Sequence, residues 1–158
     1  MKRGHLQGEQ NSQQQQHCIT GVVGAYNTVI TVDGAWKMNK EVARVDAAIG
    51  WTIEVNGELL WEGGDKVLTH NALQTEALAI LTGLKEAKNR TLSSVILRTD
   101  CSNIVASIKS YPNCKMEVAT LCFDIISIAS TMDNVVLIKC DRNDVRRAHD
   151  LAKKARLG

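Results

Sequence analysis

The sequence Asp46-Ala-Ala-Ile-Gly-Trp-Thr-Ile-Glu-Val-Asn-Gly-Glu-Leu-Leu-Trp-Glu-Gly63 carries the strongest short-range signal for a β-hairpin in the chain. At its centre is Asn56-Gly57, a dipeptide favoured in two-residue hairpin turns because both turn positions need a positive φ. β-branched and other apolar residues flank this turn on both sides, and a similar run occupies residues 28–33. We therefore predict three strands, at residues 28–33, 46–55 and 58–63.

Helical and strand-like segments alternate after this hairpin. Apolar residues recur at steps of three and four over residues 71–88, and the same spacing predicts helices around residues 104–108 and 118–132. Short apolar runs predict strands at residues 95–97 and 135–140, and a last helix is expected to begin near Asp144 or Val145. The resulting order, β-β-β-α-β-α-α-β-α, indicates an α/β fold in which helices flank a mixed sheet.

The length of 158 residues, with 44% apolar and 23% charged, fits one compact domain. Residues 1–25 contain six glutamines and little apolar periodicity, so we expect a disordered tail there and a domain over residues 26–158. No apolar run approaches the roughly 20 residues of a membrane span, and no secretory signal follows the basic start. We expect an intracellular protein, nuclear or cytoplasmic, that is neither secreted nor membrane-bound, with five unpaired cysteines.

The distribution of charge is more informative than the net charge of +2, which is too small to indicate nucleic-acid binding. Residues 139–158 hold seven Lys and Arg against three Asp, a surplus of four. Arg146, Arg147, Lys153 and Lys154 on the last predicted helix are candidate phosphate contacts. The same residues fit equally well the interpretation that they form a solvated helix face.

Three acidic residues occupy positions where a carboxylate needs a partner. Asp33 ends a strand that is otherwise apolar, Asp100 follows a strand that leads into a helix, and Glu76 lies in the first turns of the long helix. If the three converge, hard divalent cations such as Mg²⁺ would have to offset their repulsion, and two such ions about 4 Å apart support phosphoryl transfer. Alternatively, Asp33 is a turn residue, Glu76 a solvated charge and Asp100 a helix cap.

Five short motifs occur in an order typical of one family. They are Asp33-Gly-Ala-Trp-Lys37, Ala48-Ile-Gly-Trp51, Thr75-Glu-Ala-Leu-Ala79, Thr99-Asp-Cys-Ser-Asn103 and Ala148-His-Asp-Leu-Ala-Lys153. Together they resemble ribonuclease H type 1 domains, and in detail the plant reverse-transcriptase-like branch, which is related to the ribonuclease H modules of retroelements. The resemblance runs from about residue 28 to the end.

This resemblance implies a ribonuclease H-like fold, whose five-stranded mixed sheet has the strand order 3-2-1-4-5. It also implies that Asp33, Glu76 and Asp100 are metal ligands for two Mg²⁺ ions, for which Mn²⁺ can substitute. The implied reaction is endonucleolytic hydrolysis of the RNA strand of an RNA/DNA hybrid, with a 3′-hydroxyl as leaving group. Such a hybrid is recognised through its 2′-hydroxyls and phosphates rather than its base sequence.

The chain departs from the family pattern at the fourth acid, whose position is held by His149, with Asp150 one residue later. A neutral imidazole is a poorer Mg²⁺ ligand than a carboxylate, and Asp150 is turned by about 100° around the helix. Both remain candidate catalytic residues, as weak fourth ligands. The family's basic handle between helices is missing too, so modest hybrid affinity is expected.

Two alternatives to an efficient enzyme stay open. One is a catalytically weakened nucleic-acid-binding module derived from a retroelement, and the other is a domain that binds only proteins.

Overall fold

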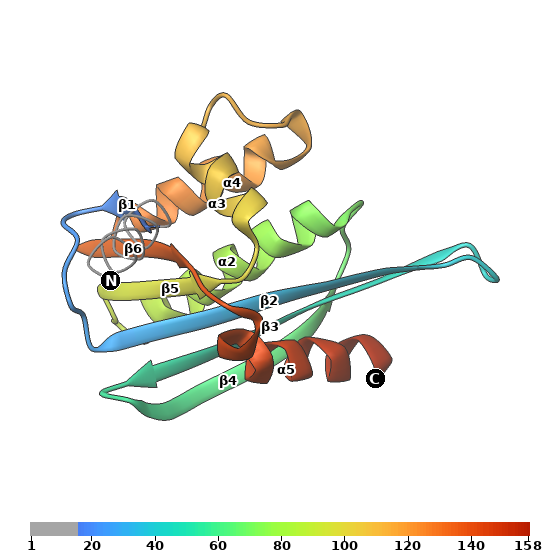
Figure 1. The fold of residues 1–158 in the computed structure, drawn as a ribbon, viewed down its shortest axis with the longest axis horizontal. Coiled ribbons are helices and arrows are strands. Elements are labelled where there is room, and N and C mark those ends of the chain that lie inside the picture. Colours follow the sequence, from blue (N-terminus) through green and yellow to red (C-terminus); the bar gives the residue numbers. More distant parts are fainter. Residues whose placement is uncertain (1–15) are drawn as a thin grey trace, which may run out of the picture.

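A twisted, mixed sheet of six strands forms the centre of the computed structural model, which describes residues 16–158 (Figure 1). The strands are β1 (Gln16–Thr20), β2 (Thr28–Asn39), β3 (Arg44–Val55), β4 (Glu58–Val67), β5 (Ser94–Thr99) and β6 (Asn134–Lys139). The helices are α2 (Ala72–Asn89), α3 (Ser102–Ser110), α4 (Met116–Ala129) and α5 (Arg146–Leu157), and the 3-10 turn η1 (Arg142–Val145) precedes α5.

The strand order across the sheet is β1-β6-β5-β2-β3-β4. β2, β3 and β4 form an antiparallel meander, whereas β5 is parallel to β2 and β6 is parallel to β5. If β1 is set aside, the remaining five strands have the predicted order 3-2-1-4-5, and the predicted α/β fold is confirmed. β2 and β3 are longer than predicted, because residues 34–39 continue the ladder out to the pair Asn39 and Arg44.

The sixth strand corrects the expected domain boundary. The predicted disordered tail ran to residue 25, but Gln16–Thr20 pairs antiparallel with β6, which places Gln16 opposite Ile138. The side chain of Asn134 fastens the chain just after this strand, because its Oδ1 accepts the Val22 N–H at 2.9 Å. The predicted disorder of residues 1–15 lies outside the described residues.

Helices cover the two faces of the sheet unequally (Figure 1). α2, α3 and α4 lie on one face, where α2 packs on β2 and β3 and closes the main apolar core. α5 lies on the opposite face, over β2, β3 and β4. None of the helices in residues 16–158 is long and apolar enough to cross a membrane.

Gly50 sets how closely α5 approaches the sheet. It lies opposite Asp33 in the β2–β3 register, and a Cβ atom at this position would overlap the carbonyl group of Ala148. A glycine is therefore needed for α5 to rest directly on the strands. This contact brings the residue after Ala148, which is His149, next to Asp33.

Candidate metal centre

The three predicted acids converge on one site. β2 and β5 are parallel neighbours in which Thr31 pairs with Arg98, so Asp33 and Asp100 stand at equivalent positions beyond that pair. α2 brings Glu76 to them from the face of the sheet that α2, α3 and α4 cover. One carboxylate oxygen from each of the three residues lies within 4.8 Å of the others. The predicted convergence is confirmed.

The start of α2 is held so that Glu76 points at the sheet. Asn71 caps the helix, because its side chain accepts the Gln74 N–H at 2.8 Å. Gly34 lets the helix come close, since a Cβ atom there would lie 3.1 Å from the backbone nitrogen of Glu76. The Gly34 N–H also donates to Glu76 Oε1 at 3.3 Å. Backbone geometry thus fixes both the depth and the direction of this carboxylate.

The pKa values of two of the three acids are raised. Burial, followed by the negative charges of Asp33 and Asp100, raises the pKa of Glu76 from 4.5 to about 9. Burial also raises the pKa of Asp33 from 3.8 to about 6, although the hydrogen bond with His149 opposes this shift. Glu76 Oε2 is buried and has no hydrogen-bond partner among the described residues.

These observations fit a divalent cation at the cluster. Buried carboxylates repel one another unless a cation or donors offset their charge, and an unpartnered buried oxygen is a free ligand atom. Carboxylate oxygens are the ligands that hard cations such as Mg²⁺ and Mn²⁺ prefer. Asp33, Glu76 and Asp100 are therefore the residues able to hold the ion.

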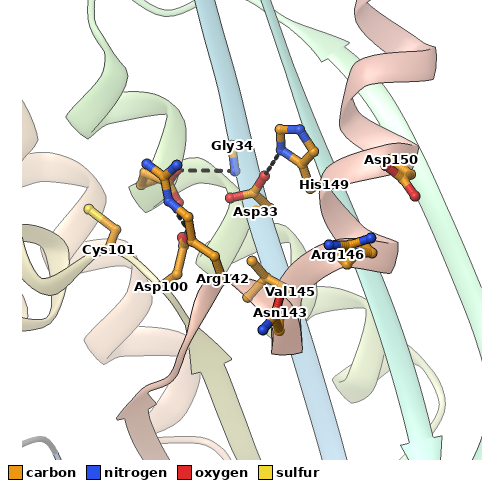
Figure 2. Close-up of a pocket in the computed structure, with 11 residues that line it drawn as sticks. Asp33, Gly34, Asp100, Cys101, Arg142, Asn143, Val145, Arg146, His149 and Asp150 are labelled. Atoms are coloured by element: carbon orange, nitrogen blue, oxygen red, sulfur yellow. Dashed lines mark hydrogen bonds and ion pairs between the residues drawn. The ribbon is translucent and has the colours of Figure 1, made fainter.

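His149 and Asp150, the two candidates for the fourth acid, both line the cavity beside the cluster, but their side chains point in different directions from α5 (Figure 2). His149 faces the cluster, where its Nδ1 is hydrogen-bonded to Asp33 Oδ2 at 2.8 Å (Figure 2). The Asp150 side chain is exposed and points away from Asp33 (Figure 2). Of the two, only His149 contacts one of the three acids.

The acids line a surface cavity of about 600 Å³ whose lining also contains basic side chains. Arg142 and Arg146 both line it, and Arg142 Nε lies 4.0 Å from Asp100 Oδ2. The Arg142 side chain is 95% exposed, so it is free to move toward a ligand. Sequence reasoning missed Arg142, although its place just after β6, at the carboxyl end of a parallel strand, is where ligands bind in such sheets.

Three of the four candidate phosphate contacts on α5, namely Arg146, Arg147 and Lys153, do not share one environment. Arg146 lines the cavity, and Lys153, seven residues later, falls about 20° from it around the helix. Arg147 is turned by about 100° and instead pairs with Glu62 of β4, its Nε lying 2.7 Å from Oε2. Arg146 and Lys153 thus lie on the cavity side of the helix, whereas Arg147 is held in its ion pair with Glu62 at the edge of the sheet.

Comparison with known proteins agrees with this architecture. The profile of the reverse transcriptase-like family matches residues 31–155. A search of curated proteins found no match. Among solved structures, RNase H1 of the halophilic archaeon Halobacterium salinarum has a TM-score of 0.71 at 21% identity, with 81% of this chain and 96% of that chain covered.

Two further similar structures hold nucleic acid. LC11-RNase H1 in complex with RNA/DNA hybrid has a TM-score of 0.71 at 20% identity, over 81% of this chain and 95% of that chain. The foamy viral protease-reverse transcriptase in complex with RNA/DNA hybrid has a TM-score of 0.69 at 14% identity, over 83% of this chain and 20% of that chain. At these identities the likeness shows a shared fold. With a family match across most of its length and this shared architecture, the chain belongs to the reverse transcriptase-like family and has a ribonuclease H-like fold.

Proposed function

We propose that the protein is a metal-dependent endonuclease that hydrolyses the RNA strand of RNA/DNA hybrids. The observation that carries this proposal is the cluster of Asp33, Glu76 and Asp100, whose carboxylate oxygens lie within 4.8 Å of one another beside an open cavity. The cluster lies where the parallel pairing of β2 with β5 ends, and its carboxylate oxygens are suited to Mg²⁺, with Mn²⁺ as a substitute. Two of the similar structures are complexes with RNA/DNA hybrid, which supports this substrate.

The protein's residues have distinct tasks in this reaction. A divalent cation bound by the three acids supplies Lewis acidity, which activates a water and stabilises the leaving 3′-oxygen. The Gly34 N–H holds the Glu76 carboxylate in place, and His149 holds that of Asp33. Arg142 and Arg146 line the same cavity as the acids and would contact the oxygens of a substrate phosphate bound there.

Hybrid recognition would depend mainly on phosphate contacts and 2′-hydroxyls. Arg146 and Lys153 provide positive charge on the cavity side of α5. We infer modest affinity with a shallow salt dependence, since few cations contribute. We also propose the plant, retroelement-related branch of the family as the origin of the domain, and the nucleus or cytoplasm as its location.

A second candidate function is a nucleic-acid-binding module with weak or no cleavage. The contact between His149 and Asp33 favours it, because an imidazole occupies the place of a fourth carboxylate and brings no negative charge. The two functions share the fold and the binding surface. They differ only in whether the phosphodiester bond is broken.

Cleavage of an end-labelled RNA/DNA hybrid in Mg²⁺ and in Mn²⁺ tests the proposal. Asp33→Asn removes a cluster carboxylate, and Asp65→Asn is the matched control because Asp65 is exposed on β4. If the protein is an enzyme, the wild type and Asp65→Asn should cleave the hybrid, and Asp33→Asn should not. Hybrid binding without cleavage would favour the binding module, and the absence of both would exclude a hybrid-directed function.

A further inference from the structure

We infer that the free protein holds one divalent cation tightly, and that His149 fills the position from which a second cation would share Asp33. This inference rests on the metal site of the proposed function and adds the number of ions to it. It starts from the two sides of the Asp33 carboxylate, which have different surroundings.

One side of Asp33 has all the carboxylate ligands. Glu76 and Asp100 converge with it, and no other acid in residues 16–158 joins this cluster. Glu76 Oε2 is buried there without a hydrogen-bond partner. Three oxygen ligands on one side, completed by water and substrate oxygens, suit the octahedral coordination of Mg²⁺ or Mn²⁺.

The other side of Asp33 is occupied by imidazole. Its Oδ2 is 2.8 Å from His149 Nδ1, which is direct hydrogen-bond distance. A cation on that oxygen would need to lie about 2.1 Å from it and would displace the hydrogen bond. The only carboxylate adjacent along the helix, Asp150, points away from Asp33 (Figure 2). A second cation would thus find one carboxylate and a neutral nitrogen ligand.

The charge balance leads to the same conclusion. Three ionised carboxylates carry −3, so one divalent cation leaves −1 and two leave +1. Asp150 also lines this cavity, but Arg142 and Arg146 outweigh its single negative charge and make a second cation still less favourable. A carboxylate at position 149 would bring the total to −4, which two divalent cations neutralise. We therefore expect a second ion to bind tightly only when the residue at position 149 is acidic.

The consequence for the reaction is that positive charge near the substrate phosphate would come partly from the protein. Arg142 is paired with Asp100 at 4.0 Å and is almost fully exposed, so it can turn from this carboxylate to a phosphate. A second ion would enter only with the substrate, whose phosphate oxygens would supply the missing ligands.

Counting Mn²⁺ ions bound to the free protein tests this inference without relying on activity. Free Mn²⁺ is measured by electron paramagnetic resonance during titration, and heats of binding are recorded in parallel. The wild type should bind one ion tightly, and His149→Asp should bind two. His149→Asn is the matched control, because it is polar and uncharged at the same position and should still bind one.

The outcomes separate this inference from the proposed function. Two tight ions on the wild type, or one on a folded His149→Asp protein, would overturn the inference while leaving a metal-dependent enzyme intact. No tight ion on the wild type, or unchanged binding in Asp33→Asn, would overturn the metal site itself. Circular dichroism establishes that each variant is folded, and if His149→Asp fails to fold, His149→Glu supplies the carboxylate instead and should bind two ions.

Discussion

Replacing Glu76 by glutamine should stabilise the metal-free protein, and the gain should grow with pH. Glutamine keeps an oxygen that can accept the Gly34 N–H, as Glu76 Oε1 does at 3.3 Å, but it removes the buried charge. Burial, with the nearby charges of Asp33 and Asp100, raises the pKa of Glu76 in the folded protein from 4.5 to about 9. Between these values the folded protein keeps a proton that the unfolded chain has lost.

The sign and size of the effect follow from proton linkage. Because the folded state binds the extra proton, the free energy of unfolding falls as pH rises from 4.5 toward 9. One proton corresponds to a slope of at most about 1.4 kcal/mol per pH unit. From pH 6.5 to 8.5 the wild type should therefore lose up to about 2.7 kcal/mol relative to Glu76→Gln. Asp33, whose pKa is raised to about 6, titrates mainly below this window.

Urea denaturation at pH 6.5, 7.5 and 8.5 in the presence of EDTA measures this difference. Glu58→Gln is the control, because Glu58 is exposed at the start of β4. Its stability should follow that of the wild type at every pH. Saturating Mg²⁺ should flatten the wild-type dependence, since the cation replaces the proton in the cluster. A constant difference between wild type and Glu76→Gln across the three pH values would refute the reasoning.

Three other variants test the surfaces around this site. Arg146→Ala should weaken hybrid binding by about 1 kcal/mol, or about fivefold, and reduce the salt slope of binding by about one. Arg147→Ala should change the affinity and the salt slope much less, because Arg147 is already paired with Glu62. Fluorescence anisotropy at several salt concentrations measures both. Gly50→Ala should cost about 1–3 kcal/mol in urea denaturation and lower cleavage, since the new methyl group overlaps the Ala148 carbonyl and pushes α5 outward; unchanged stability would contradict that packing. Asn134→Ala should accelerate amide hydrogen exchange in β1 and cost about 1–2 kcal/mol, because it deletes the contact to Val22; an unaltered exchange rate would show that this side chain does not hold the strand.

Local patterns single out each of the three acids as a candidate, and the resemblance to ribonuclease H domains is what favours their convergence over a turn residue, a solvated charge and a helix cap. Asp33 lies within β2 and Asp100 follows β5, each two residues beyond the parallel pair of Thr31 and Arg98, and parallel neighbouring strands bring such residues to the same place. Glu76 follows from the helical spacing of α2, since its position relative to the apolar face directs it toward the sheet. Each of these inferences needs only the pattern of one element and a general rule of topology.

The positions of His149 and Arg142 in the site depend on contacts that no local sequence pattern contains. The position of His149 follows from the fit of Ala148 onto Gly50, two residues almost a hundred positions apart in the chain. The sequence therefore shows that position 149 lacks an acid, but not that its imidazole contacts Asp33. The approach of Arg142 to Asp100 likewise depends on where η1 lies.

β1 has consequences for how this domain should be produced. Without Gln16–Thr20, the backbone donors and acceptors of β6 along Val135–Ile138 would form an open edge beside apolar side chains. Exposed strand edges of this kind template pairing with further chains, whereas a short edge strand interrupted by a bulge, as β1 is between Cys18 and Thr20, resists it. A protein truncated at residue 26, the boundary that composition suggests, would thus be prone to aggregate, and the cut belongs before residue 16.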